Sequence, residues 1–159
     1  MKQQTTPYPQ KAATHFKQGY NCAQSILLTM QEYYGNKHNK LIPKIATAFG
    51  AGIGRQGSLC GALTSGVMAI GLKHGTNEPS LEKRLQAYTL ARQLYEKFTQ
   101  EFSTPFCLEL IGYDLTKPEE LEKAQKAKVF DKKCTHFIKK TIEILINLET
   151  EHSRASSGI

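Results

Sequence analysis

Apolar residues recur at spacings of three and four along most of this chain of 159 residues. This period places them on one face of an α-helix, whereas a strand requires alternation of apolar and polar residues. Because the sequence contains no convincing alternating run of β-branched residues, it predicts an all-α fold. Glycines, prolines and capping residues divide the pattern into a bundle of about six to seven helices. These predicted helices cover residues 11–34, 39–49, 58–73, 81–102, 104–110, 116–127 and 129–148.

The length and composition fit one folded domain. A hydrophobic content of 40% is enough for one sizeable core in a chain of this length. We therefore expect a single domain over residues 1–159, with its core at roughly 14–146. The polar ends, residues 1–10 and 149–159, are expected to be flexible tails.

The sequence shows no sign of export or of membrane insertion. Residues 1–10 lack the charged and apolar pattern of a secretion signal. The longest weakly polar run, residues 59–72, is shorter than the ~20 residues that a membrane span requires. We therefore expect a cytoplasmic protein without membrane insertion. In that reducing compartment, the four cysteines are not expected to form permanent disulfides.

The net charge of +7 makes nucleic acid a partner to consider. However, the lysines between residues 117 and 140 alternate with acidic residues, and no aromatic residues are interleaved as base-stacking platforms. We therefore expect a solvated helix face and no nucleic-acid partner. Helical proteins of this size often form homodimers, but the sequence identifies no contacting face.

The glycine-rich segment at residues 50–57 contains the letters of a dinucleotide-binding fingerprint, in the run 52–57. That fingerprint requires a preceding strand, and a helix is predicted here instead, so we favour a tight loop between helices. A second interpretation is a simple anion site at the start of the following helix. The residues of that cofactor-binding or anion site would be Gly54, Arg55, Gly57 and Gly61.

Cys22, Cys60, Cys107 and Cys134 lie on four different predicted helices or at their ends. None belongs to a CxxC pair, so a metal site would have to be assembled by tertiary structure rather than by one loop. Free cysteines are also common as small buried hydrophobic residues. Spacing alone therefore leaves chemistry and simple packing evenly balanced.

Cys60 and Cys107 occupy the positions that most favour a thiolate. We expect Ser58 to cap the helix of Cys60, and residues 104–105 to begin the helix of Cys107. In the first turn of a helix, free N–H groups lower a thiol pKa and increase the reactive fraction.

The histidines offer no clearer chemistry. His15 shares a predicted helix face with Cys22, but the two stand roughly 10 Å apart along the axis, too far for direct coupling. We expect a surface or capping role for each histidine. They are His15, His38, His74, His136 and His152.

The order of the short motifs around the cysteines resembles a known family. The motifs are residues 19–24 (GYNCAQ), 48–55 (AFGAGIGR), 60–62 (CGA), 107–114 (CLELIGYD) and Cys134. The family is C_GCAxxG_C_C, small bacterial and archaeal proteins labelled redox-active that have four cysteines and a central CGAxxG motif. The resemblance covers roughly residues 14–145. In one departure, Ser65 replaces the closing glycine of the motif, and Gly66 follows one place later.

The resemblance implies that Cys22, Cys60, Cys107 and Cys134 carry the redox or ligand role. Two mechanisms stay open: the cysteines bind an iron–sulfur cluster or another metal, or they cycle between thiol and disulfide. The partner would be a redox protein or a small molecule that the sequence does not identify. An alternative class is a non-catalytic module that binds a small molecule or a partner and whose cysteines are structural. The sequence does not decide whether the protein is an enzyme.

Overall fold

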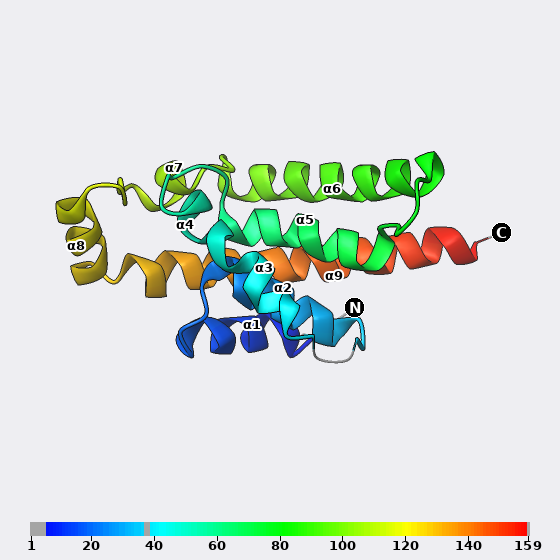
Figure 1. The fold of residues 1–159 in the computed structure, drawn as a ribbon, viewed down its shortest axis with the longest axis horizontal. Helices are drawn as coiled ribbons and strands as arrows, with labels where there is room; N and C mark the ends of the chain where they lie inside the picture. The colour runs from blue at the N-terminus through cyan, green and yellow to red at the C-terminus, as the bar shows by residue number, and fades with distance from the viewer. Residues whose placement is uncertain (1–5, 37–38, 159) are drawn as a thin grey trace.

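The computed structural model describes residues 6–36 and 39–158 (Figure 1). Within these ranges the chain forms eight regular α-helices and no strand, which confirms the all-α prediction. The helices are α1 (Tyr8–Lys17), α2 (Cys22–Tyr33), α3 (Leu41–Ala46), α5 (Gly61–His74), α6 (Leu81–Phe102), α7 (Cys107–Ile111), α8 (Pro118–Lys126) and α9 (Thr135–Ser157). Three short irregular turns separate some of them: η1 (Thr47–Phe49), α4 (Gly50–Ile53) and η2 (Phe130–Cys134).

The helix count exceeds the predicted six to seven because the first predicted helix is two, α1 and α2. Between them Gly19 adopts a φ of +100°, a conformation that glycine adopts without strain. Asn21 then begins α2 with a capping box. Its side-chain oxygen accepts a hydrogen bond from the N–H of Gln24 at 3.0 Å, and its own N–H donates to the Gln24 side chain at 3.0 Å. Cys22 is therefore the first residue of α2.

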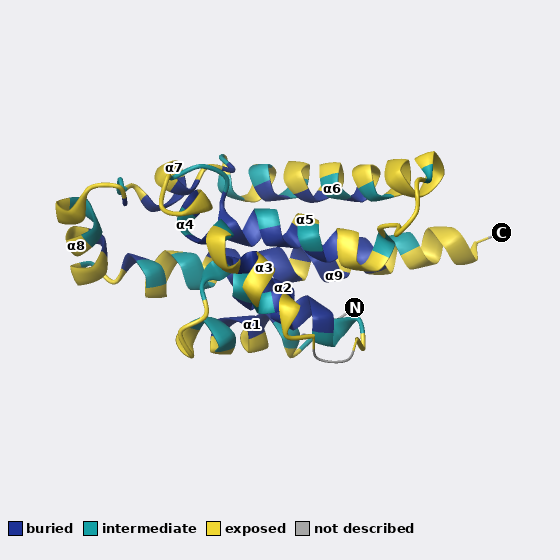
Figure 2. Cartoon of the chain, in the orientation of Figure 1, coloured by how far each residue is buried: buried dark blue, intermediate teal, exposed yellow. Residues whose placement is uncertain are grey.

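Helix α5 lies at the centre of the bundle, in contact with α2, α6 and α9. Figure 1 shows α5, α6 and α9 lying lengthwise together, with α1, α2 and α3 along one side. The buried residues of these helices face one another, while the outer faces are exposed (Figure 2). Ser65, which replaces the motif glycine, is fully buried and donates a hydrogen bond to the Gly61 carbonyl at 2.6 Å. A Cβ on the neighbouring Gly66 would stand 2.8 Å from the Leu94 side chain, so α5 and α6 pack closely at this point.

Helix α9 continues beyond its predicted end. We expected residues 149–159 to be a flexible tail, but the helix reaches Ser157 and Glu149 is buried. The Glu149 carboxylate accepts a hydrogen bond from the Tyr34 hydroxyl at 2.8 Å and lies 3.0 Å from Nε2 of His74. These contacts hold the polar end of α9 against the bundle. We expected a surface or capping role for His74; it lies in the last turn of α5, and its side chain is only 11% exposed.

At the other end of the chain, α1 begins at Tyr8, inside the predicted tail of residues 1–10, and Pro9 is buried. Residues 1–5, 37–38 and 159, and with them His38, lie outside the described residues. Among the helices that are described, none combines the length and the apolar content needed to cross a membrane.

Candidate functional site

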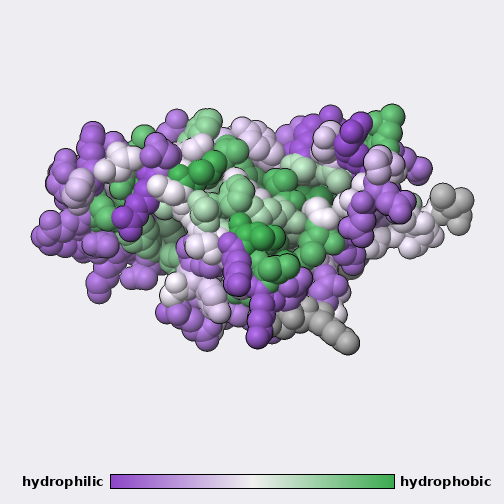
Figure 3. Space-filling view, in the orientation of Figure 1, coloured by the Kyte–Doolittle hydropathy of each residue, from purple (hydrophilic) through white to green (hydrophobic). Residues whose placement is uncertain are grey.

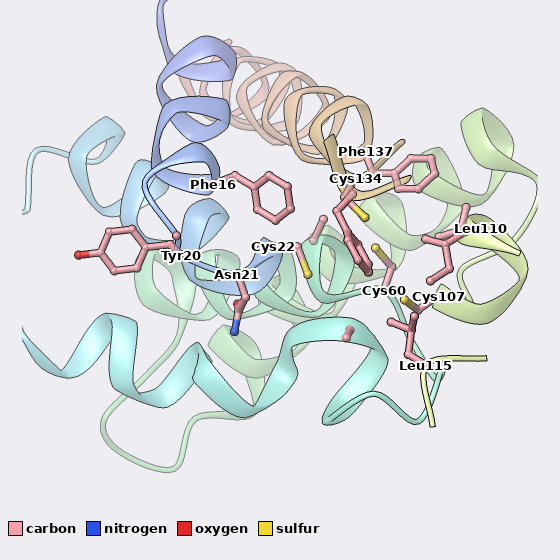
Figure 4. Close-up of a pocket in the computed structure, with 15 residues that line it drawn as sticks. Phe16, Tyr20, Asn21, Cys22, Cys60, Cys107, Leu110, Leu115, Cys134 and Phe137 are labelled. Carbon is pink, nitrogen blue, oxygen red and sulfur yellow. The ribbon is translucent and has the colours of Figure 1, made fainter. Parts of the chain in front are cut away.

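The structure brings all four cysteines to the wall of one cavity of about 300 Å³ (Figure 4). Three of them lie at the start of a helix. Cys22 and Cys107 are the first residues of α2 and α7, and Cys60 directly precedes α5. Cys134 lies in continuous helical backbone, where η2 passes into α9. The rest of the wall is predominantly apolar. Its large side chains are Phe16, Tyr20, Leu110, Ile111, Leu115, Phe130 and Phe137.

Cys22 is held by residues on both sides of it. The Asn21 cap donates from Nδ2 to the Thr47 carbonyl at 2.8 Å, which fixes the start of α2 against η1. A Cβ on Gly50 would stand 2.7 Å from the same Nδ2 atom, so only glycine leaves room for this cap. On the other side, a Cβ on Gly61 would stand 2.5 Å from Sγ of Cys22. The glycine of the CGA motif therefore makes room for the sulfur of a distant cysteine.

Cys60 and Cys107 are joined through the backbone. Leu59 and Phe106, which immediately precede the two cysteines, form an isolated antiparallel bridge. The N–H of Cys60 donates to the Pro105 carbonyl at 2.8 Å, and the N–H of Cys107 donates to the carbonyl of residue 58 at 2.7 Å. The bridge therefore places the two cysteines on diagonally related positions of one face.

Both helices start later than predicted. We expected Ser58 to cap the helix of Cys60 and residues 104–105 to begin the helix of Cys107. Instead, Cys60 itself is the N-cap of α5, and Phe106 is the N-cap of α7. The reason is the bridge, because the residues before each cysteine are extended and their backbone groups are paired across it.

The glycine-rich segment forms a left-handed turn over the cavity. Five consecutive residues, 51–55, have φ between +55° and +73°. For residues other than glycine this conformation costs roughly 1–2 kcal/mol each, and Ala51, Ile53 and Arg55 all adopt it. A Cβ on Gly52 would stand 2.7 Å from Cβ of Cys107, so the turn packs directly on a cysteine. Since η1 directly precedes it where the fingerprint requires a strand, the favoured interpretation as an interhelical loop is confirmed.

The residues of the predicted anion site lie in different surroundings. Gly54 and Arg55 are exposed, whereas Gly61 is buried against Cys22. Gly57 lies against Leu108, where a Cβ would stand 2.8 Å from the leucine Cβ. Gly61 is therefore part of the cysteine site, and an anion site at Gly54, Arg55 and Gly57 stays a prediction.

Cys134 ends a π-helical turn, η2, that leads into α9. Such turns are rare and occur frequently at functional sites. The preceding residue, Lys133, donates from Nζ to the carbonyls of Leu110 and Ile111 at 3.4 and 3.2 Å. Those carbonyls belong to the last residues of α7, so Lys133 connects the turn of Cys134 to the helix of Cys107.

The prediction that helix starts lower the thiol pKa is wrong for this site. Burial raises the pKa of Cys60 well above its ordinary value and that of Cys107 to about 12. Burial likewise raises the pKa of Cys22 and Cys134. The favourable backbone groups are present: those of residues 51, 23 and 61 form hydrogen bonds with the Cys22 sulfur and lower its pKa. Burial of the thiol away from water raises the pKa by more than these bonds lower it.

The four thiols also influence one another. A charge on Cys22 raises the pKa of Cys60, Cys107 and Cys134. All four are free thiols. Within the described part of the chain, no group of three or more histidine, cysteine or acidic side chains is arranged to hold a metal ion. The sulfurs therefore line a common space without converging on one point.

The sequence reasoning missed several residues of this site. Asn21 and Gln24 carry the capping-box spacing, which could have placed Cys22 at a helix start. Gly52 was assigned only to a loop, and its contact with Cys107 has no signal in the sequence. Lys133 directly precedes Cys134 in the sequence, but its hydrogen bonds to α7 depend on the tertiary fold.

The fold and the cavity define a class of protein, an all-helical fold with four cysteines around one apolar space, three of them at helix starts. The chain belongs to the family described as "Putative redox-active protein (C_GCAxxG_C_C)", whose model matches residues 20–148. This match confirms the resemblance drawn from the motifs, and the matched range includes all four cysteines. No curated protein and no solved structure matches the chain.

Proposed function

We propose that this chain is a redox protein in which Cys22, Cys60, Cys107 and Cys134 hold an iron–sulfur cluster in their shared cavity. The observation that carries the proposal is the gathering of four cysteines from distant segments around one cavity of about 300 Å³. Four cysteine thiolates are the usual ligands of such clusters. A bound cluster supplies transfer of single electrons.

The size of the cavity favours a cluster over a single ion. Around zinc, four sulfurs each stand ~2.3 Å from one metal, which leaves little space between them. A space of about 300 Å³ is far larger and is comparable to a small-ligand pocket. In a [4Fe–4S] cluster each thiolate binds its own iron atom, so the four sulfurs stand farther apart than around a single ion.

The electrostatics of the site also favour a cofactor that neutralises thiolates. Burial keeps the four thiols protonated at neutral pH, which makes them poor nucleophiles on their own. Metal binding displaces those protons. The backbone N–H groups around Cys22 and Cys60 then stabilise charge on sulfur, and Phe16, Phe130 and Phe137 exclude water.

Thiol–disulfide exchange is a second candidate, supported by the bridge between Leu59 and Phe106. Diagonal neighbours in an antiparallel pair have Cα atoms roughly 7–8 Å apart. A disulfide needs a Cα separation below about 7 Å. A slight movement of the backbone would therefore bring Cys60 and Cys107 within range of a disulfide.

Anaerobic purification, followed by reconstitution with ferrous iron and sulfide, tests the proposal. The expected result is brown protein with stoichiometric iron and acid-labile sulfide, and a visible absorbance that falls on reduction with dithionite. Replacing any one of the cysteines by serine should remove most of this absorbance. Ser65→Ala is the matched control, because Ser65 is buried in α5 but does not line the cavity.

Colourless protein without iron and sulfide after reconstitution would overturn the cluster. Thiol counting under mild oxidant then separates the remaining mechanisms. Loss of two thiols, with a Cys60–Cys107 disulfide identified by mass spectrometry, would establish the second candidate. Four unchanged thiols would reject both and leave a binding module with structural cysteines.

A further inference from the structure

Lys133 is the residue through which two cysteine-bearing segments are connected. Its Nζ donates to the carbonyls of Leu110 and Ile111, at 3.4 and 3.2 Å. These are the last residues of the five-residue helix α7, whose first residue is Cys107. A helix this short has few internal hydrogen bonds, and its final carbonyls need partners from outside. The lysine therefore fixes the position of α7 relative to η2, which ends at Cys134.

The lysine acts from outside the cavity. It does not line the cysteine cavity, but lies in a surface hollow together with Lys132 and His136. Leu110 and Phe137 line both spaces and form the wall between them. Lys133 is therefore not a ligand. Its side chain is exposed, so water partly screens the charge that it exerts on the sulfurs across this apolar wall.

Lys133 directly precedes Cys134 in η2, and Asp131 and Lys132 belong to the same turn. Glu109 lines the same surface hollow as Lys133. Lys133 is the cation of this turn that also donates hydrogen bonds to α7.

We propose that Lys133 is a positioning residue of the redox site, which holds α7 in place through its terminal carbonyls and raises the reduction potential of the bound group through a fixed positive charge. The second half of this proposal rests on the proposed function. Reduction adds one electron from an external reductant such as dithionite, with no bond made or broken in the protein. A nearby positive charge stabilises the more negative, reduced state, so its removal lowers the potential.

Three variants of the full chain test the proposal. Lys133→Gln removes the charge and shortens the reach to α7, Lys133→Arg keeps both charge and donors, and Lys132→Gln removes the neighbouring charge without a bond to α7. Hydrogen exchange is measured on the reduced, iron-free protein. We expect the amides of Leu110 and Gly112 to exchange roughly threefold to tenfold faster in Lys133→Gln, and at the wild-type rate in the other two.

The second measurement is the midpoint potential of the reconstituted protein. Lys133→Gln should lower the potential by about 30 mV, which corresponds to about a threefold change in the equilibrium constant for one-electron reduction. Lys133→Arg should have the wild-type potential. Equal exchange rates and equal potentials in Lys133→Gln and Lys132→Gln would overturn the proposal. A wild-type protein that takes up no iron would reject the proposed function instead, while the exchange measurement would still test the link to α7.

Discussion

Gly61 leaves open the space that Sγ of Cys22 occupies: a Cβ built on this glycine would stand 2.5 Å from the sulfur and 2.9 Å from the carbonyl oxygen of Phe49. The backbone group of Gly61 also bonds to the same thiol. One residue of the CGA motif therefore sets the position of a cysteine that lies far away in the sequence.

Gly61→Ala is expected to destabilise the protein by roughly 1–3 kcal/mol, because the added methyl group overpacks the site. It should also displace Cys22 and so reduce iron uptake. Gly71→Ala is the matched control, since it lies in the same helix with nothing within 4 Å of its Cβ position. There alanine should stabilise by roughly 0.5–1 kcal/mol. Urea unfolding measures both, and equal effects would contradict the role of Gly61.

A substitution in the left-handed turn should stabilise the protein, in contrast to Gly61→Ala. Arg55 is exposed and has a φ of +73°, so Arg55→Gly should relieve roughly 1–2 kcal/mol of strain, part of which the flexibility of unfolded glycine offsets. We expect a net stabilisation of about 0.5–1 kcal/mol. Arg84→Gly, at an exposed position in α6, should instead cost about 1 kcal/mol. If thermal and urea unfolding show that both variants lose stability, the turn is not strained at Arg55.

Stability of the reduced, iron-free protein should fall with pH above about 9. Burial raises the pKa of Cys107 from its ordinary value of 9.0 to about 12. Between these values the unfolded thiol has lost its proton and the folded one keeps it, so stability declines as the pH rises. Each such thiol contributes a slope of about 1.4 kcal/mol per pH unit.

Replacing Cys107 by alanine isolates this effect. The variant should show a shallower loss of stability between pH 9 and pH 11, while the titration of lysines and tyrosines cancels in the comparison with wild type. Urea unfolding at several pH values measures the two slopes. Identical slopes would mean that the Cys107 thiol is not protected from ionisation in the folded protein.

The buried carboxylate of Glu149 stabilises the other end of the bundle. Glu149→Gln should destabilise by roughly 1–3 kcal/mol, because the contacts with Tyr34 and His74 lose their charged acceptor. Glu151→Gln is the control on the same helix, where an exposed side chain lies 3.8 Å from Lys97 and contributes about 0.5 kcal/mol or less. Unfolding measurements test the difference. Iron uptake should be unchanged in both, since His74 lies about 20 Å along α5 from the cysteine end.

Local patterns were sufficient to predict where most of the helices lie, but not all of their bounds. The bounds of α6 are those predicted, because its apolar period is long and the Ser80 side chain caps it by accepting from the N–H of Lys83 at 3.3 Å. The end of α9 was missed because Glu149 looks like a surface residue in sequence. Its partners, Tyr34 and His74, are supplied by two other helices.

The sequence was sufficient to predict which cysteines belong to the candidate site, but not how their pKa values are shifted. The motif order identified the four cysteines, but the sign of the thiol pKa shifts depends on burial, which only the packed structure determines. The bridge of Leu59 with Phe106 is a single pair between remote segments and leaves no periodic trace. The left-handed residues 51–55 include alanine, isoleucine and arginine, none of which signals such a conformation.

The cavity takes its wall from Phe16 near one end of the chain and from Phe137 close to the other. During synthesis on the ribosome, Cys22, Cys60 and Cys107 therefore emerge before the segment that completes their enclosure. A cofactor held by all four cysteines could therefore be fully enclosed only after translation has passed Phe137.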